Sequence, residues 1–339
     1  MEEFGRGSQL VATWGANLLT NPDVGKCLLG MKPRYSTASR LATYVLMTGL
    51  ALAGCQKREA ATAPAASANA PAPAASGEKR YALKGEIVSV KAAEHVLIIH
   101  HEAIPEYMPS MTMEFKVGQG DVAIARAGQR IRGEMYMKGG DIYLEKIWPD
   151  DTQTVGEIAA ATNALTQDTA MRGKGAYREI GETAPDFTLL DQEGRAVAMS
   201  RFRGKQVMLN FIFTRCPIAN MCPAATMRMT ALQKAAREAG ITNLELISIS
   251  FDPANDTPGV LKEYAEARGI DTTNFTFLTG PDAAVRHLLA QMGIIREFEG
   301  ETIKHTLATL LINDKGQIIH RVDGSQWQVE DFLSRMRKE

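Results

Sequence analysis

The feature that most constrains this 339-residue chain is a strand-to-helix junction that carries two cysteines. Val207 to Phe213 is an unbroken apolar run with β-branched and aromatic members, which predicts a strand buried on both faces. Cys216 and Cys222 follow, and Pro223 then opens a run of helix formers that closes at Gly240. Open α/β sheets place their chemistry at the carboxyl ends of such strands. We therefore expect two thiols at the functional edge of an α/β domain.

Two interpretations of this cysteine pair follow from residue type and position. Buried cysteines are often inert core residues. At the start of a helix, however, the backbone amides favour thiolate over thiol. The position therefore favours sulfurs that react or bind a metal.

Composition excludes several classes of protein. The formal net charge of −1 gives no indication of a nucleic-acid partner. The four cysteines, at 27, 55, 216 and 222, are too few for a disulfide scaffold. The length exceeds one typical domain, so we expect two.

The N-terminal region has the layout of a targeting segment. Residues 1–30 show no periodicity, and we interpret them as an upstream mis-start. Residues 31–55 place basic residues before a short apolar run and small residues, which is typical of a signal peptide. Leu52-Ala53-Gly54-Cys55 resembles the bacterial lipobox, which implies lipidation of Cys55 and a membrane anchor in the cell envelope. Residues 56–79 are an Ala/Pro-rich linker that we expect to be disordered.

Residues 80–149 contain five short strand-like segments separated by glycine-rich turns. This pattern predicts a small all-β domain, a five-stranded barrel of the OB type. Its middle carries His101, Met108, Met111 and Met113. Met111 and Met113 share one face of a strand, and imidazole with thioethers is a soft ligand set that selects Cu(I). On spacing alone, core packing remains the alternative.

This stretch resembles the CusF-like periplasmic copper-binding domains, which carry a His and a Met-Thr-Met run. The resemblance implies that His101, Met111 and Met113 bind copper. The tryptophan that caps the metal in CusF is absent; Met108 stands before the proline instead, and we name it as a further thioether candidate.

Residues 150–180 form a polar connector with a short helix, and 181–339 the second domain. In that domain PDFTLLD and RAVAMS predict an opening hairpin, and TLATLLIND and GQIIHRVDG a closing one. Strands at 244–251 and 275–280 alternate with helices between them. The order predicts a thioredoxin-like α/β fold.

Four features of 181–339 together resemble the Sco/SenC family: APDFTLLDQEG, FIFTRCP with its second CP, FDPANDTP, and Lys304-His305-Thr306 before the LLINDKG hairpin. The resemblance implies a copper site made by Cys216, Cys222 and His305, where His305 begins the strand beside the central one. Two thiolates and an imidazole can hold Cu(I) and tolerate Cu(II).

Two departures bear on mechanism. Sco proteins usually have three residues between the cysteines, and here there are five, so the loop must fold back. Thioredoxin-like reductases place a cis-proline opposite the cysteines, whereas no proline occurs after Pro281, which favours metal binding. Asp252 or Asp256 could support the site by hydrogen bonds, or could serve only in helix capping and turn formation.

The resemblances imply a periplasm-facing metallochaperone, not an enzyme, that delivers copper to the CuA-bearing subunit of cytochrome c oxidase. Other copper carriers or thiol reductases are further expected partners. Periplasmic copper storage or resistance is one alternative. Another is a thiol–disulfide oxidoreductase in which Cys216 attacks and Cys222 resolves. A peroxiredoxin-like reductase fits less well, because the sequence after Cys216 does not match.

Overall fold

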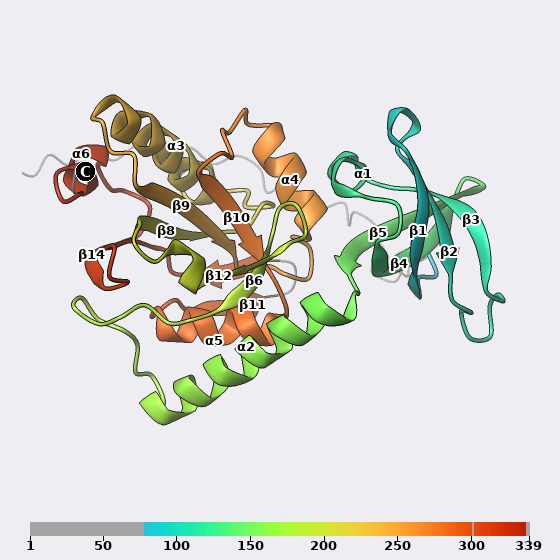
Figure 1. Cartoon of the computed structure of the whole chain (residues 1–339), viewed down its shortest axis with the longest axis horizontal. Coiled ribbons are helices and arrows are strands. Elements are labelled where there is room, and N and C mark those ends of the chain that lie inside the picture. The colour runs from blue at the N-terminus through green and yellow to red at the C-terminus, as the bar shows by residue number, and fades with distance from the viewer. Residues whose placement is uncertain (1–77, 300–301, 337–339) are drawn as a thin grey trace, which may run out of the picture. The chain divides into compact units, whose positions relative to one another are not determined.

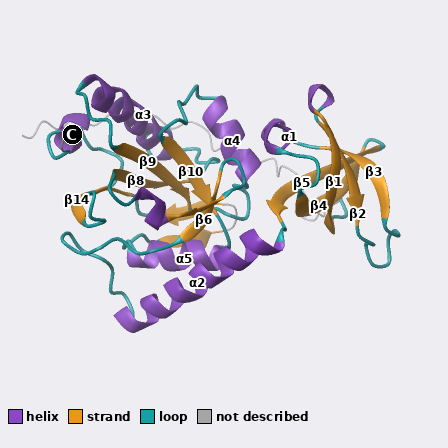
Figure 2. Ribbon diagram, viewed as in Figure 1, coloured by secondary structure: helices purple, strands orange, loops and turns teal. Residues whose placement is uncertain are grey.

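The structure is a computed structural model that describes residues 78–299 and 302–336. The predicted mis-start, signal peptide, lipidated Cys55 and most of the linker lie outside these residues. The described chain forms a β-barrel followed by an α/β domain (Figures 1 and 2).

The barrel confirms the five-stranded all-β prediction. Its strands close in the order β1-β2-β3-β5-β4, and all neighbours are antiparallel except β3 and β5. The elements are β1 (Tyr81–Lys91), a 3-10 turn (Ala92–Glu94), β2 (Val96–His101), β3 (Met111–Lys116), α1 (Gln119–Ile124), β4 (Arg130–Lys138) and β5 (Asp141–Pro149).

Strand alternation fills the barrel. In β1 the inward residues Leu83 and Ile87 are about 1% exposed, whereas Lys84 and Glu86 between them face solvent. The β4–β5 hairpin turns through Gly139 and Gly140, both at positive φ (61° and 89°). A two-residue turn with positive φ at both positions matches the right-handed strand twist, and glycine adopts it without strain.

The second domain confirms the thioredoxin-like α/β prediction. Its seven-stranded sheet has the order β14-β13-β8-β9-β10-β6-β7, with β8, β9 and β10 parallel. The strands of this domain are β6 (Thr188–Asp191), β7 (Ala196–Ala198), β8 (Gln206–Ile212), β9 (Leu244–Ser250), β10 (Phe275–Thr279), β11 (Arg296–Glu299), β12 (Thr302–His305), β13 (Ala308–Ile312) and β14 (Ile318–Asp323). Its helices are α2 (Thr152–Arg172), a 3-10 turn (Met199–Phe202), α3 (Cys222–Glu238), α4 (Pro258–Glu266), α5 (Asp282–Gln291) and α6 (Val329–Leu333).

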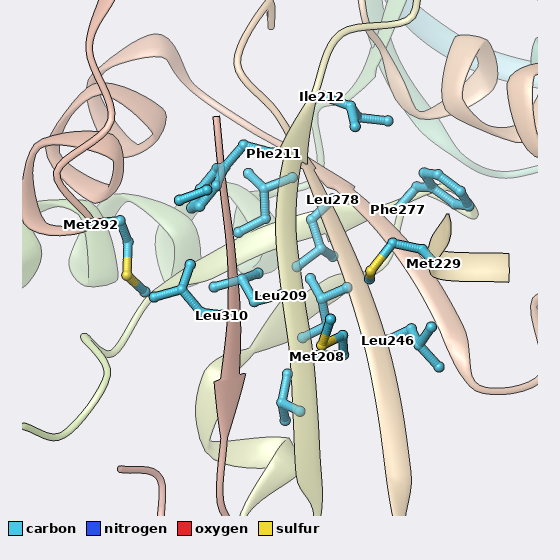
Figure 3. Close-up of a cluster of buried hydrophobic side chains, with 14 of the residues drawn as sticks. Met208, Leu209, Phe211, Ile212, Met229, Leu246, Phe277, Leu278, Met292 and Leu310 are labelled. Atoms are coloured by element: carbon cyan, nitrogen blue, oxygen red, sulfur yellow. The ribbon is translucent and has the colours of Figure 1, made fainter. Parts of the chain in front are cut away.

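Strand β8 is central, and all seven of its residues are buried. Figure 3 shows Leu209 and Phe211 of β8 among side chains of the adjacent strands β9 and β13 and of β10, which lies beyond β9. Burial on both faces explains the continuous apolar run, because helices cover both sides of a parallel sheet. This packing fixes the point at which the chain leaves β8 for the cysteine turn.

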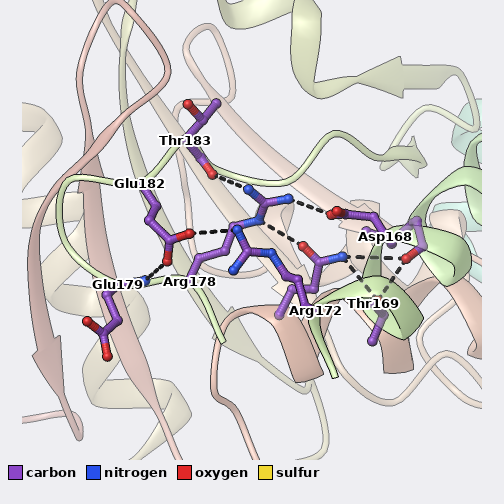
Figure 4. Close-up of polar contacts among 9 residues, drawn as sticks. Asp168, Thr169, Arg172, Arg178, Glu179, Glu182 and Thr183 are labelled. Carbon is purple, nitrogen blue, oxygen red and sulfur yellow. Dashed lines mark hydrogen bonds and ion pairs between the residues drawn. The ribbon is translucent and has the colours of Figure 1, made fainter. Parts of the chain in front are cut away.

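Helix α2 is longer than the short connector helix that the sequence predicted. It spans 21 residues, and Leu165 on its buried side belongs to the core of the α/β domain. The segment after it is held by Arg178, which forms an ion pair with Asp168 and donates to Gln291 Oε1 and the Thr183 carbonyl, each at 2.8 Å (Figure 4). Three contacts from one guanidinium fix this part of the connector against the domain.

Candidate metal centre

Two cysteines and one histidine meet at the carboxyl end of β8. The Sγ atoms of Cys216 and Cys222 and a ring nitrogen of His305 all lie within 4.8 Å of one another. Cys222 is the first residue of α3 and is fully buried, whereas Cys216 is partly exposed. The structure therefore brings together the three residues that the sequence selected, and copper binding by them stays a prediction.

The five-residue loop between the cysteines folds back through a tight turn, as its length required. The amide of Met221 donates to the Ile218 carbonyl at 3.0 Å. Ser325, far away in sequence, donates its hydroxyl to the Asn220 carbonyl at 2.6 Å. These contacts compensate for the two extra residues, so both sulfurs still approach one point.

His305 reaches the cysteines from an unexpected element. We expected it to begin the strand beside β8, but that strand is β13, which starts at Ala308 and pairs with β8. His305 ends β12, half of a separate two-stranded ribbon with β11. Its ring packs against Phe251 and Phe213, with centroids 4.4 and 5.6 Å away.

The tautomer of His305 suits a metal ligand. Its Nδ1 lies 3.2 Å from the Thr306 carbonyl oxygen, which can only accept, so Nδ1 carries the proton. The lone pair of Nε2 is then free for a metal. Burial among aromatic rings lowers the pKa of His305, and the hydrogen bond to Thr306 opposes this in part. The ring is therefore neutral at pH 7.

The thiol of Cys222 does not behave as the sequence predicted. Its place at a helix start favoured a thiolate, but burial, with the nearby Cys216 adding to it, raises the pKa of Cys222 well above its usual range. Desolvation outweighs the helix terminus because the sulfur has no access to water. A cation bound between the sulfurs would reverse this balance and deprotonate the thiol.

Two buried carboxylates hold the residues before Cys216. Asp256, with no exposed surface, accepts hydrogen bonds from the amide and hydroxyl of Thr214 and from the Ser250 hydroxyl. Burial raises the pKa of Asp256 to about 6. Asp252 pairs with Arg215 at 2.7 Å. Both acids thus fix the approach to the cysteine turn, and Thr257, not either acid, is the N-cap of α4.

The barrel brings its predicted ligands to one end. His101 ends β2 and pairs directly across the strands with Met111, while Met113 pairs with Ile99. Met111 is 43% exposed, and Met113 and Met108 pack in part against the barrel core. His101 is fully buried, and its Nδ1 lies 2.7 Å from the Glu102 carbonyl. Its buried Nε2 has no hydrogen-bond partner within the part of the chain that the structure describes.

Comparison with known proteins assigns each region. The SCO1/SenC family model matches residues 175–339. A SCO1 protein homolog of Bacillus subtilis is 32% identical over 156 residues, which cover 44% of this chain and 79% of the relative. The chain belongs to the SCO1/SenC family. A second family model, described as copper binding periplasmic protein CusF, matches residues 80–149.

Two further proteins are similar to part of this chain. A Haemophilus influenzae protein named as a peroxiredoxin is 32% identical over 146 residues, 42% of this chain and 85% of that protein. The crystal structure of a SCO1/SenC family lipoprotein from Bacillus anthracis is 25% identical, covers 47% of this chain and 96% of that one, and has a TM-score of 0.43.

The SCO1/SenC domain also has a cleft that sequence patterns did not indicate. It has a volume of about 520 Å³ and is lined by His305, Met221 and the ion-paired Arg321 and Asp323, among others. Its walls come from segments far apart in sequence, so no local motif could reveal it. Among the described residues, no helix is long and apolar enough to cross a membrane.

Proposed function

We propose that this SCO1/SenC family member is a cell-envelope copper metallochaperone that delivers copper to the CuA centre during cytochrome c oxidase assembly. The observation that carries the proposal is the convergence of Cys216, Cys222 and His305 within 4.8 Å. Two sulfurs and one imidazole match the soft donors that Cu(I) prefers, and the set tolerates Cu(II).

The residues bind the cargo by ordinary ligand chemistry. His305 offers Nε2 because Nδ1 is held by the Thr306 carbonyl. Copper binding displaces the thiol protons, including that of the buried Cys222. The cleft beside His305 gives an incoming protein ligand access to that side of the site. Exchange of one ligand at a time would then pass the ion to an acceptor without a change of oxidation state.

The barrel adds a second copper site in the same chain, formed by His101, Met111 and Met113, with Met108 as a further thioether. The orphaned Nε2 of His101 supports this, because a buried polar atom without a partner is costly unless a ligand satisfies it. Two sites on one chain raise the effective copper concentration at each. Storage of copper, or resistance to it, is a second role that this site supports.

The match to the model of a periplasmic protein, CusF, supports an envelope location. Within it, we propose a lipid anchor on Cys55 after removal of residues 31–54, a linker over 56–79, a barrel over 80–149 and a SCO1/SenC domain over 181–339. Copper carriers and thiol reductases of the envelope are further candidate partners.

A thiol–disulfide oxidoreductase is the second candidate function. The partial exposure of Cys216 and full burial of Cys222 suit an attacking and a resolving thiol. In that reaction Cys216 thiolate attacks a target disulfide, and Cys222 then displaces the target thiol, which leaves this chain oxidised and the target reduced.

Copper titration of the full chain with and without His305→Ala separates these functions. We expect His305→Ala to remove or alter one copper equivalent and its spectrum. His287→Ala, at a partly buried histidine of α5 that is not part of the group of Cys216, Cys222 and His305, should change neither. If His305→Ala leaves stoichiometry and spectrum unchanged and thiol exchange persists, the chaperone proposal fails and the oxidoreductase stands.

A further inference from the structure

A methionine outside the predicted ligand set lies at the same end of the barrel. Strand β1 begins, β2 ends, β3 begins and β4 ends at this end, as the antiparallel pairs Gly85 with His101, His101 with Met111, and Tyr81 with Met135 establish. Met137 lies two residues beyond Met135, next to the hairpin turn that leads to β5. Register alone does not bring Met137 to His101, because Gly85, the partner of His101, pairs with Ile131 on β4. The contact of Met137 with Tyr107, in the loop between His101 and Met111, is what joins it to this end of the barrel. We define the barrel mouth as Tyr81, His101, Tyr107, Met111, Met113 and Met137.

Strand alternation directs Met137 inward. Met135 is fully buried in the barrel core, and residues two apart on a strand share a face. Tyr136, between them, instead points its hydroxyl at Glu145 on the other face. Yet Met137 is 48% exposed, because the barrel ends there. Its side chain is thus on the ligand face but still open to solvent.

The sulfur of Met137 is held by a specific contact. The Tyr107 hydroxyl donates to Met137 Sδ at 3.1 Å, and the Tyr107 ring stacks on Tyr81 with centroids 3.9 Å apart and planes 20° apart. Tyr107 lies in the segment that joins His101 to Met111. A thioether is a weak acceptor, so this contact orients the sulfur while leaving it easy to release.

We propose that Met137 is an additional thioether ligand for Cu(I) at the barrel mouth, held in reserve by Tyr107. This inference rests on the proposed barrel site. Thioethers are neutral, soft donors that bind Cu(I) without losing a proton. Met137 has flexible torsions and solvent exposure, which suit a ligand that meets an arriving ion or replaces Met111 as the ion leaves. The step is exchange of one Cu–S bond for another, and no electron moves.

The test uses the full chain with serine at all four cysteine positions, so that methionine supplies the only sulfur. Anaerobic competition for Cu(I) against the chelator bicinchoninate measures affinity. We expect Met137→Leu to weaken binding about tenfold and Met135→Leu, the matched core variant on the same strand face, to leave it unchanged. Tyr107→Phe keeps the ring stack but frees the sulfur, and should not weaken binding. The methyl carbon-13 resonance of Met137 should shift when Cu(I) is added.

The outcomes are distinct. The inference is overturned if Met137→Leu leaves the copper affinity unchanged and the Met137 methyl signal does not shift when copper is added. In that case, loss of binding in the Met111→Leu, Met113→Leu double variant would still support the barrel site itself. A loss in Tyr107→Phe equal to that in Met137→Leu also overturns it, because the contact would then be structural. If the double variant binds copper as the parent does, the barrel site of the proposed function fails itself.

Discussion

The barrel and the SCO1/SenC domain present a histidine in the same way but surround it with different sulfur. In both, Nδ1 lies against the carbonyl of the following residue, Glu102 for His101 and Thr306 for His305, which leaves Nε2 free. The barrel then offers thioethers, with Met111 43% exposed. The SCO1/SenC domain offers thiols, with Cys222 fully buried. The same backbone contact thus orients the histidine in a thioether site and in a thiol site.

The difference decides how each site responds to its surroundings. A thioether has no proton to lose, whereas a thiol must be deprotonated before it binds a metal. Burial raises the pKa of Cys222, so copper must displace a proton from this thiol over a wider range of pH. The pH should therefore control the distribution of copper between the two sites. Protons compete with copper for the sulfurs of the thiol site only, so a lower pH shifts copper toward the barrel.

The largest expected effect is on the pH dependence of copper affinity. In the absence of copper, Cys222 stays protonated over the accessible pH range. Each pH unit by which the solution is made more acidic should therefore weaken Cu(I) binding at the thiol site about tenfold, from the Cys222 proton alone. Chelator competition between pH 8 and pH 6 should show this pH dependence in a Met111→Leu, Met113→Leu double variant, in which the thiol site remains. The control is the four-serine chain, with serine at all four cysteine positions, in which only the barrel site remains; its copper affinity should depend less on pH. Equal pH dependence in the two variants would contradict the difference drawn between the sites.

A smaller effect is expected when the support of the cysteine turn is removed. Asp256→Ala leaves the Thr214 amide and two hydroxyls without their acceptor, and should lower the free energy of unfolding by about 2 to 4 kcal/mol. Denaturant unfolding at pH 7 measures this. Asp186→Ala, at an exposed aspartate, should change it by less than about 0.5 kcal/mol.

The same variant has a pH signature. The pKa of Asp256 rises from 3.8 unfolded to about 6 folded, so the folded chain holds a proton that the unfolded chain releases between these values. The resulting stability is present at low pH and is lost as pH rises through 6. The gap between parent and Asp256→Ala should therefore be larger at pH 5 than at pH 8; a gap that grows toward high pH would contradict this assignment.

The smallest effect concerns the barrel. Gly85 pairs with His101, and a Cβ added there would lie 2.6 Å from the His100 carbonyl oxygen and 2.9 Å from His101 Cα. Gly85→Ala should cost about 1 to 3 kcal/mol and displace His101. The same substitution in the four-serine chain should also lower its copper affinity. Gly156→Ala, on the open surface of a helix, should change neither the stability nor the copper affinity. Unchanged copper binding would show that the barrel site tolerates movement of its histidine.

The sequence by itself determined the barrel strands, the central strand with its cysteine turn, and the order of the ligand-bearing segments, but not the ribbon that carries His305. The apolar run of β8, the Pro223 helix start and the period-2 strands of the barrel are local patterns, and local propensity and alternation suffice to predict them. The family motifs then selected Cys216, Cys222 and His305, which the structure brings together.

Tertiary structure alone decided what those residues meet. His305 packs against Phe213 and Phe251, which lie far from it in sequence. The burial that raises the pKa of Cys222 and the Tyr107–Met137 contact also depend on segments that are separated in the chain. Spacing along the chain does not reveal Met137, because its role depends on a contact with Tyr107 that forms only when the barrel folds. Desolvation and side-chain direction depend on which residues pack around a side chain, and the sequence pattern alone does not identify those residues.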